Sequence, residues 1–169
     1  METRTLVSLL TRGAERIRVL ATDVPEDQAR WRPDPDAWST LEVVNHLADE
    51  ECEDFRARLE ATLHRPQAPW PPTDPGGWVT SRNYNGRDLD DSVQRFLAER
   101  AASLEWLRTL VSPDWTTAHV APFGPISAGD VAASWVAHDI LHMRQLVELH
   151  WAYTTERLVP HSTAYAGTW

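Results

Sequence analysis

The stretch SAGDVAASWVAHDILHMRQLVELHW, residues 127–151, has the pattern of one long amphipathic helix. Ser127 can cap its first turn, where Asp130 complements the helix dipole. At about 100° per residue, the inward positions share one arc of roughly 80°. This arc consists of Val131, Trp135, His138, His142, Gln145 and Leu149. Two imidazoles, one turn apart, therefore face the interior of the fold.

Three more helices are predicted before this one. An apolar stripe from Leu6 to Leu20 predicts a helix from about residue 4 to 22, with Gly13 in close approach to a neighbour. Ser39 and Glu42 form a capping box that begins a helix ending near Leu63. The third stripe consists of Leu89, Val93, Phe96, Leu104, Leu107 and Val111. The resulting class is all-α, a four-helix bundle, with no comparable strand signal.

The connection from His64 to Arg87 contains five prolines and three glycines. Proline disrupts helices, so no helix is expected in this long loop between the second and third helices. Connections of this length are usually functional or disordered.

Length and composition limit the classes of protein. The 169 residues fit a single domain, 1–169, and the net charge of −9 argues against nucleic acid as a ligand. No apolar run is long enough for a membrane span, and the first residues do not resemble a secretion signal. A single cysteine, Cys52, excludes an intrachain disulfide, so we expect a cytoplasmic protein.

A histidine pair at this spacing is compatible with two interpretations. The rings of His138 and His142 could be satisfied core residues or two ligands of one metal ion, and the pair alone does not decide between them. A third ligand is needed. His46 is the candidate, but it lies one position beyond the apolar arc of its helix, where an exposed histidine is equally expected.

Three groups of residues resemble the DinB-like superfamily in order and spacing. They are Trp38-Ser39, Glu42 and Asn45 to Glu50; Pro122-Phe123-Gly124 with Ile126-Ser127; and Trp135 to Gln145. The resemblance implies an up-down-down-up four-helix bundle, often dimeric. It further implies one divalent metal on His46, His138 and His142.

The reaction is implied less sharply. The superfamily includes thiol-dependent enzymes, which favours a metal-dependent enzyme that activates a low-molecular-weight thiol for transfer to, or isomerisation of, a small electrophile. The first alternative is a metal-dependent hydrolase using metal-bound hydroxide, and the second is a non-catalytic metal-binding stress protein. Three imidazoles with an open position suit zinc or nickel, and also iron or manganese.

Several residues could surround the metal. Glu50 and Glu53 share the face of His46, where a carboxylate could orient the ring or act as a base, although a solvated acidic face is the simpler interpretation. Gln145 could contact the site from the fourth helix. Arg100 lies in the third apolar stripe and needs a carboxylate partner such as Glu50 or Glu53, or serves as a clamp for a substrate anion.

Other candidates are assigned to structure or to association. Cys52 points away from His46 and is interpreted as a small core residue, and His119 as a loop histidine. Trp106 and Trp151 project away from their apolar stripes, which predicts a homodimer that uses at least one of them.

Overall fold

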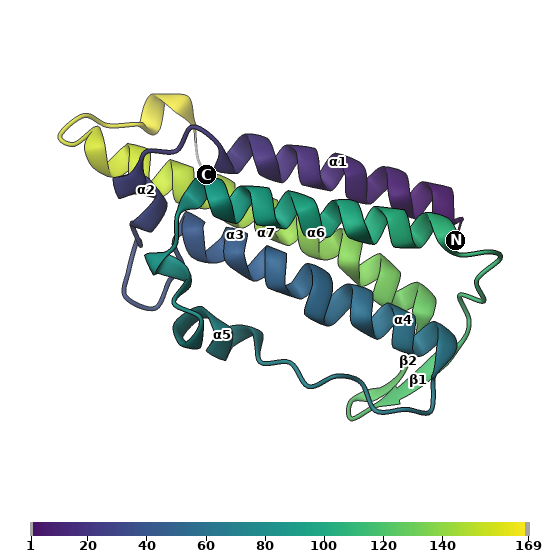
Figure 1. The fold of residues 1–169 in the computed structure, drawn as a ribbon. Helices are drawn as coiled ribbons and strands as arrows, with labels where there is room; N and C mark the ends of the chain where they lie inside the picture. Colours follow the sequence, from purple (N-terminus) through teal and green to yellow (C-terminus); the bar gives the residue numbers. More distant parts are fainter. Residues whose placement is uncertain (1, 168–169) are drawn as a thin grey trace.

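The chain forms a four-helix bundle in a computed structural model that describes residues 2–167. The bundle consists of α1 (Thr3–Ala21), the segment α3 (Thr40–Asp49), η1 (Glu50–Arg56) and α4 (Ala57–His64), then α6 (Leu89–Thr109) and α7 (Ala128–Arg157). The segment from α3 to α4 runs parallel to α6, while α1 and α7 run the opposite way (Figure 1). The expected all-α bundle of up-down-down-up topology is therefore confirmed.

The long connection between α4 and α6 follows from this topology. Because both segments run in the same direction, the chain has to return along the whole bundle, as Figure 1 shows. Contrary to expectation, the return contains a short helix, α5 (Pro75–Ser81), and a single turn, η2 (Tyr84–Gly86). Proline is compatible with α5 because Pro75 occupies its first position, where no backbone donor is needed.

One ion pair and two side-chain hydrogen bonds hold this return segment against α3. The Asp49 carboxylate is fully buried and accepts hydrogen bonds from Arg82, Tyr84 and Arg95. Arg87 donates to the Asn45 side chain over 2.9 Å. The end of the connection is thus fixed to the helix that carries His46.

Smaller elements complete the fold. They are α2 (Glu26–Arg30), η3 (Ala164–Ala166) and an antiparallel hairpin of β1 (Ala118–Ala121) and β2 (Gly124–Ser127), which the sequence did not predict. The third helix ends at Thr109, and Val111 is 90% exposed, so its place in the predicted stripe was wrong. Among residues 2–167, no helix combines the length and the apolar character needed to cross a membrane.

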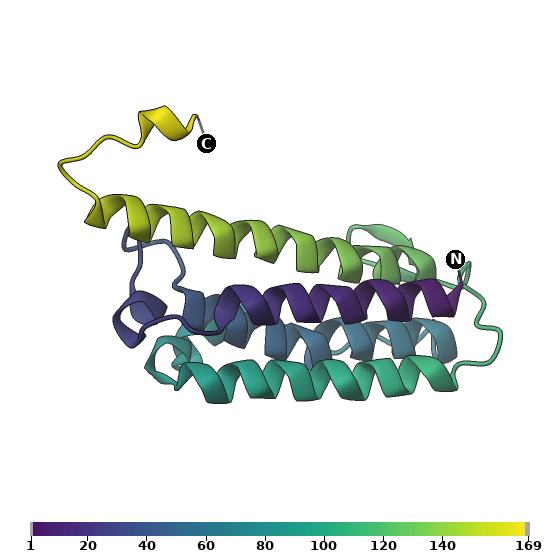
Figure 2. The ribbon, with the colours of Figure 1, turned by 90° about the horizontal axis from the view of Figure 1, so that it is seen from above.

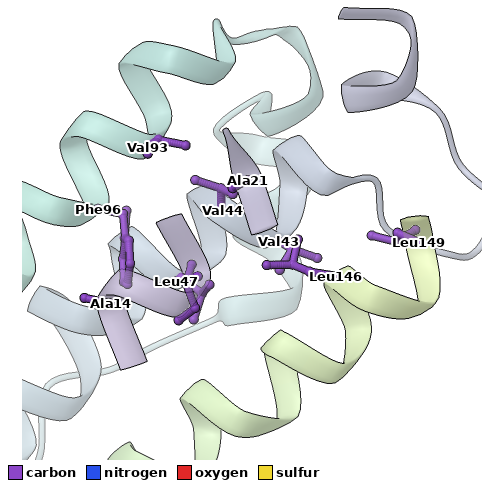
Figure 3. Close-up of a cluster of buried hydrophobic side chains, with 11 residues drawn as sticks. Ala14, Ala21, Val43, Val44, Leu47, Val93, Phe96, Leu146 and Leu149 are labelled. Carbon is purple, nitrogen blue, oxygen red and sulfur yellow. The ribbon is translucent and has the colours of Figure 1, made fainter. Parts of the chain in front are cut away.

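Two apolar clusters form the core, one in each half of the bundle. Figure 3 shows the first, where Leu47 of α3, Phe96 of α6 and Leu146 of α7 meet. The second gathers around Leu10, Leu104 and Trp135. The four helices lie side by side along their length (Figure 2). The buried polar residues described next lie in the same bundle.

Candidate metal centre

His46, His138 and His142 lie together between α3 and α7. The Nε2 atom of His138 is 3.3 Å from that of His46 and 3.0 Å from that of His142. One ligand atom of each ring lies within 4.8 Å of the others. Two nitrogens bound at about 2.0–2.1 Å to one tetrahedral ion are about 3.3–3.4 Å apart. The three rings could therefore hold one ion with little movement.

Local helix signals place these rings. The capping box predicted at Ser39 and Glu42 is present, and α3 begins after it. A second box, formed by Ser127 and Asp130, begins α7. His46 is only 4% exposed, so its position beyond the apolar arc does not make it a surface residue.

The three imidazoles are neutral at physiological pH. Burial lowers the pKa of His46 to about 3 and that of His138 to about 2, and neighbouring His142 lowers both further. Burial also lowers the pKa of His142, although its hydrogen bond to Gln145 opposes this. Neutral rings can direct a lone pair at a cation, which is the form that metals bind.

Gln145 fixes the ring of His142. Its Oε1 atom lies 2.8 Å from Nδ1 of His142, so that nitrogen donates the hydrogen bond and Nε2 is left as an acceptor facing the other rings. Such contacts commonly orient metal-ligating histidines. Nδ1 of His46 is buried without a hydrogen-bond partner among the described residues, and this ring is positioned instead by packing against Trp38.

Glu50 brings a carboxylate to the cluster. Its Oε2 atom is 3.2 Å from Nε2 of His138 and 3.9 Å from Nε2 of His46, and the residue is 6% exposed. Burial raises the pKa of Glu50 to about 7, Asp54 adds to this and Arg58 opposes it. The solvated-face interpretation was thus wrong for Glu50. It holds for Glu53, which is exposed and pairs with Arg82.

The backbone at Glu50 departs from the α-helix. Residues Glu50–Arg56 form a π-helical segment, which the sequence did not predict. Insertions of this kind change the rotation per residue and often occur at functional sites. Here two consecutive carboxylates are both buried: Glu50 faces the histidines and Glu51 faces Arg100.

Arg100 is 2% exposed, but its partners differ from those expected. It donates over 2.8 Å to Glu51 and, through two nitrogens, to Asp139. It also donates to the backbone oxygen of Leu10, and Trp135 completes the network by donating to Glu51. All three guanidinium nitrogens are engaged by the protein, so nothing here favours the substrate-clamp interpretation.

The other candidates lie outside the cluster. His119 is not a loop residue but a buried residue of β1, with Nδ1 2.9 Å from the oxygen of Pro66 and its ring stacked on Trp70. Cys52 is half-buried, and burial raises the pKa of its thiol to about 11. Trp106 is half-buried against the second core cluster.

Two aromatic side chains flank the cluster, and sequence reasoning gave them no role at the site. The Trp38 ring is 4.8 Å from the His46 ring between centroids, and the Phe55 ring is 4.9 Å from that of His138. The contact of Phe55 with His138 forms only when η1 and α7 are packed together, whereas Trp38 and His46 belong to the same segment. The spacing of apolar residues along the sequence does not predict this arrangement.

The fold and the inward-facing histidines define a class of protein. A sequence model of the DinB superfamily matches residues 9–146, and the chain belongs to this superfamily. The predicted resemblance is therefore confirmed.

One solved structure of the same fold is YfiT from Bacillus subtilis, which is 19% identical, with a TM-score of 0.75, over 88% of this chain and 85% of that one. It is described as "a probable metal-dependent hydrolase with an unusual four-helix bundle topology". No curated protein matches the sequence.

Proposed function

We propose that His46, His138 and His142 hold one divalent metal ion and that the chain is a metal-dependent hydrolase. Among residues 2–167, no fourth histidine and no cysteine joins the three neutral imidazoles, and three imidazoles are the donor set of catalytic zinc sites that keep a position open. The description of YfiT agrees with this proposal. Zinc or nickel is the expected ion, and iron or manganese suits the same ligands.

The position of Glu50 is the observation that carries the proposal. A bound divalent ion lowers the pKa of water and so supplies a nucleophile near neutral pH. The Glu50 carboxylate lies 3.2 Å from Nε2 of His138, and from there it would accept the proton of that water and return it to a leaving group. Gln145 meanwhile keeps His142 in the tautomer that the site needs.

Thiol transfer is the second candidate. Cys52 is half-buried with a raised pKa, so an external low-molecular-weight thiol would be required, with a small electrophile as its acceptor. A thiol has an ordinary pKa of about 8.5 and would ionise beside a metal without a dedicated base. Water needs a base to take its proton more than a thiol does, so the buried carboxylate of Glu50 favours hydrolysis over thiol transfer.

The test begins with the metal content of protein purified without added metal. We expect one equivalent, lost in His142→Ala and kept in His64→Ala, since His64 is an exposed histidine. The metal-loaded protein should hydrolyse chromogenic esters or amides without thiol. Glu50→Gln should keep the metal but lower the rate about 10²–10⁴-fold, the usual contribution of a general base, whereas Glu53→Gln should not.

Other outcomes would overturn the proposal. Turnover only when a thiol and an electrophile are both present would establish the transferase instead. A metal that raises the melting temperature without either activity would establish a structural ion. Metal binding that survives His142→Ala would show that the metal is not bound at the three histidines.

A further inference from the structure

A cavity of about 500 Å³ lies beside the metal centre, between the segment preceding α3 and the second half of α7. Trp38, Ala37, Leu149 and Ala152 contribute apolar walls. Its size is within the range of pockets for small organic molecules.

Two residues connect this cavity to the histidines. Gln145 lines the cavity and is hydrogen-bonded to His142. Trp38 lines it as well, and its ring is parallel to that of His142 at 6.5 Å and packs against His46 at 4.8 Å. A molecule bound in the cavity would therefore contact the side chains that position two of the three proposed ligands.

The two charged residues that line the cavity are both acidic. Asp36 and Glu148 are among its lining residues, and none of the residues that line it is basic. Glu148 pairs with Arg144 over 3.2 Å, but both side chains are exposed, and exposed pairs contribute little. Carboxylates beside a tryptophan ring are the elements with which proteins bind organic cations, because the ring face attracts positive charge.

We propose that this cavity binds a substituted ammonium group, and that the substrate of the metal centre carries one. The second part rests on the proposed function, whereas binding does not. The apolar walls contact the alkyl substituents, the Trp38 ring faces the cation, and Asp36 and Glu148 balance its charge. The cleavable bond of the substrate would then extend past Gln145 towards the histidines.

The test compares choline with 3,3-dimethylbutan-1-ol, which has the same shape without the charge. Binding is followed by NMR through the side-chain amide of Gln145, in zinc-loaded and in metal-free protein. We expect choline to bind at least about tenfold more tightly than the alcohol. We also expect Trp38→Leu to weaken choline about threefold to thirtyfold, in keeping with the strength of cation–π contacts.

The charge variants complete the design. Asp36→Asn and Glu148→Gln should each reduce the preference for choline, whereas Glu105→Gln, at an exposed position on α6, should not. Equal binding of the two probes, or a preference untouched by all three cavity variants, would overturn the inference. Ester hydrolysis without a preference for the cation would leave the proposed function standing and remove only this site. Cation binding without hydrolysis would leave the cation site standing and remove the proposed function.

Discussion

Arg100 and Asp139 form a bidentate ion pair inside the bundle. Two guanidinium nitrogens each donate to one carboxylate oxygen over 2.8 Å, and both side chains are 2% exposed. Asp139 follows His138 in the sequence, and Glu51, the other partner of Arg100, follows Glu50. The network therefore fixes both segments that supply the polar side chains of the candidate metal centre.

Replacing Arg100 with methionine should destabilise the protein strongly. The substitution leaves Glu51 and Asp139 buried without their cation, and breaking a buried ion pair in this way costs about 3–5 kcal/mol. The loss should appear in urea unfolding followed by circular dichroism. The folded fraction should still bind one metal, since no proposed ligand is removed.

Arg108→Met is the matched control. Arg108 is an exposed residue of the same helix, and its replacement should change the free energy of unfolding by no more than about 0.5 kcal/mol. If the two variants unfold at the same urea concentration, the buried network does not hold the bundle together.

Two glycine-to-alanine substitutions should act in opposite directions. A Cβ atom on Gly13 would lie 2.1 Å from Asp139 Oδ2, so Gly13→Ala must displace that carboxylate, at a typical cost of about 1–3 kcal/mol. A Cβ atom on Gly76 in α5 would have no atom within 4 Å beyond its chain neighbours and the nearby backbone of its own helix, and alanine there should be neutral or stabilise by up to about 1 kcal/mol. Thermal unfolding of both variants measures the difference, and a stabilised Gly13→Ala would disprove the close approach.

Local signals in the sequence were sufficient for the four helices of the bundle and for two of the three histidines. The capping residues Ser39 and Ser127 act within one turn, and the spacing of His138 and His142 follows from the helix period alone. His46 could not be identified in this way. A wheel places it beside the apolar arc, and only the resemblance to the superfamily selected it.

The missed features depend on packing or on a change of helix period. A constant 100° per residue fails at the π-helical segment, so the burial of Glu51 and its pairing with Arg100 were not predicted. The same holds for Phe55 of η1, which reaches His138 of α7 only in the packed bundle. Which side chains meet across two helices depends on how the helices pack, and the periodicity of a single sequence does not reveal it.

Gln145→Ala should weaken metal binding without removing it. The hydrogen bond to Nδ1 of His142 selects the tautomer with a free Nε2, and loss of such contacts typically lowers metal affinity about 10–100-fold. Competition with a chelating dye measures the affinity. Gln94→Ala, at an exposed position on α6, should leave it unchanged. Equal affinities for the two variants would show that Gln145 does not orient the ligand.

The expected homodimer stays a prediction, and so does the use of Trp151, which is half-buried on α7. Trp106 packs against the core, so a better candidate surface than Trp106 is the apolar groove between α1 and α7, where Val19 is 59% and Ile140 52% exposed. Val19→Glu and Ile140→Glu should convert a dimer into a monomer in light scattering, because they place charge in an apolar contact. Val111→Glu, at a position 90% exposed outside this groove, should not. A monomeric mass for the unaltered protein would show that the predicted homodimer does not form.

Cys52 should react slowly with alkylating reagents while the protein is folded. Burial raises the pKa of its thiol from 9.0 to about 11, so at pH 8 the thiolate fraction is about 100-fold lower than in the unfolded chain. Mass spectrometry of iodoacetamide labelling, with and without urea, measures this ratio.

The same shift in the pKa of Cys52 sets a direction for stability against pH. The folded state keeps the thiol proton between pH 9 and about 11, where the unfolded state releases it, so this group lowers the free energy of unfolding as pH rises through that window. Cys52→Ala should remove that part of the pH dependence and leave metal content unchanged, since Cys52 is not among the proposed ligands. Labelling as fast in the folded protein as in urea would show that the thiol is not protected by burial.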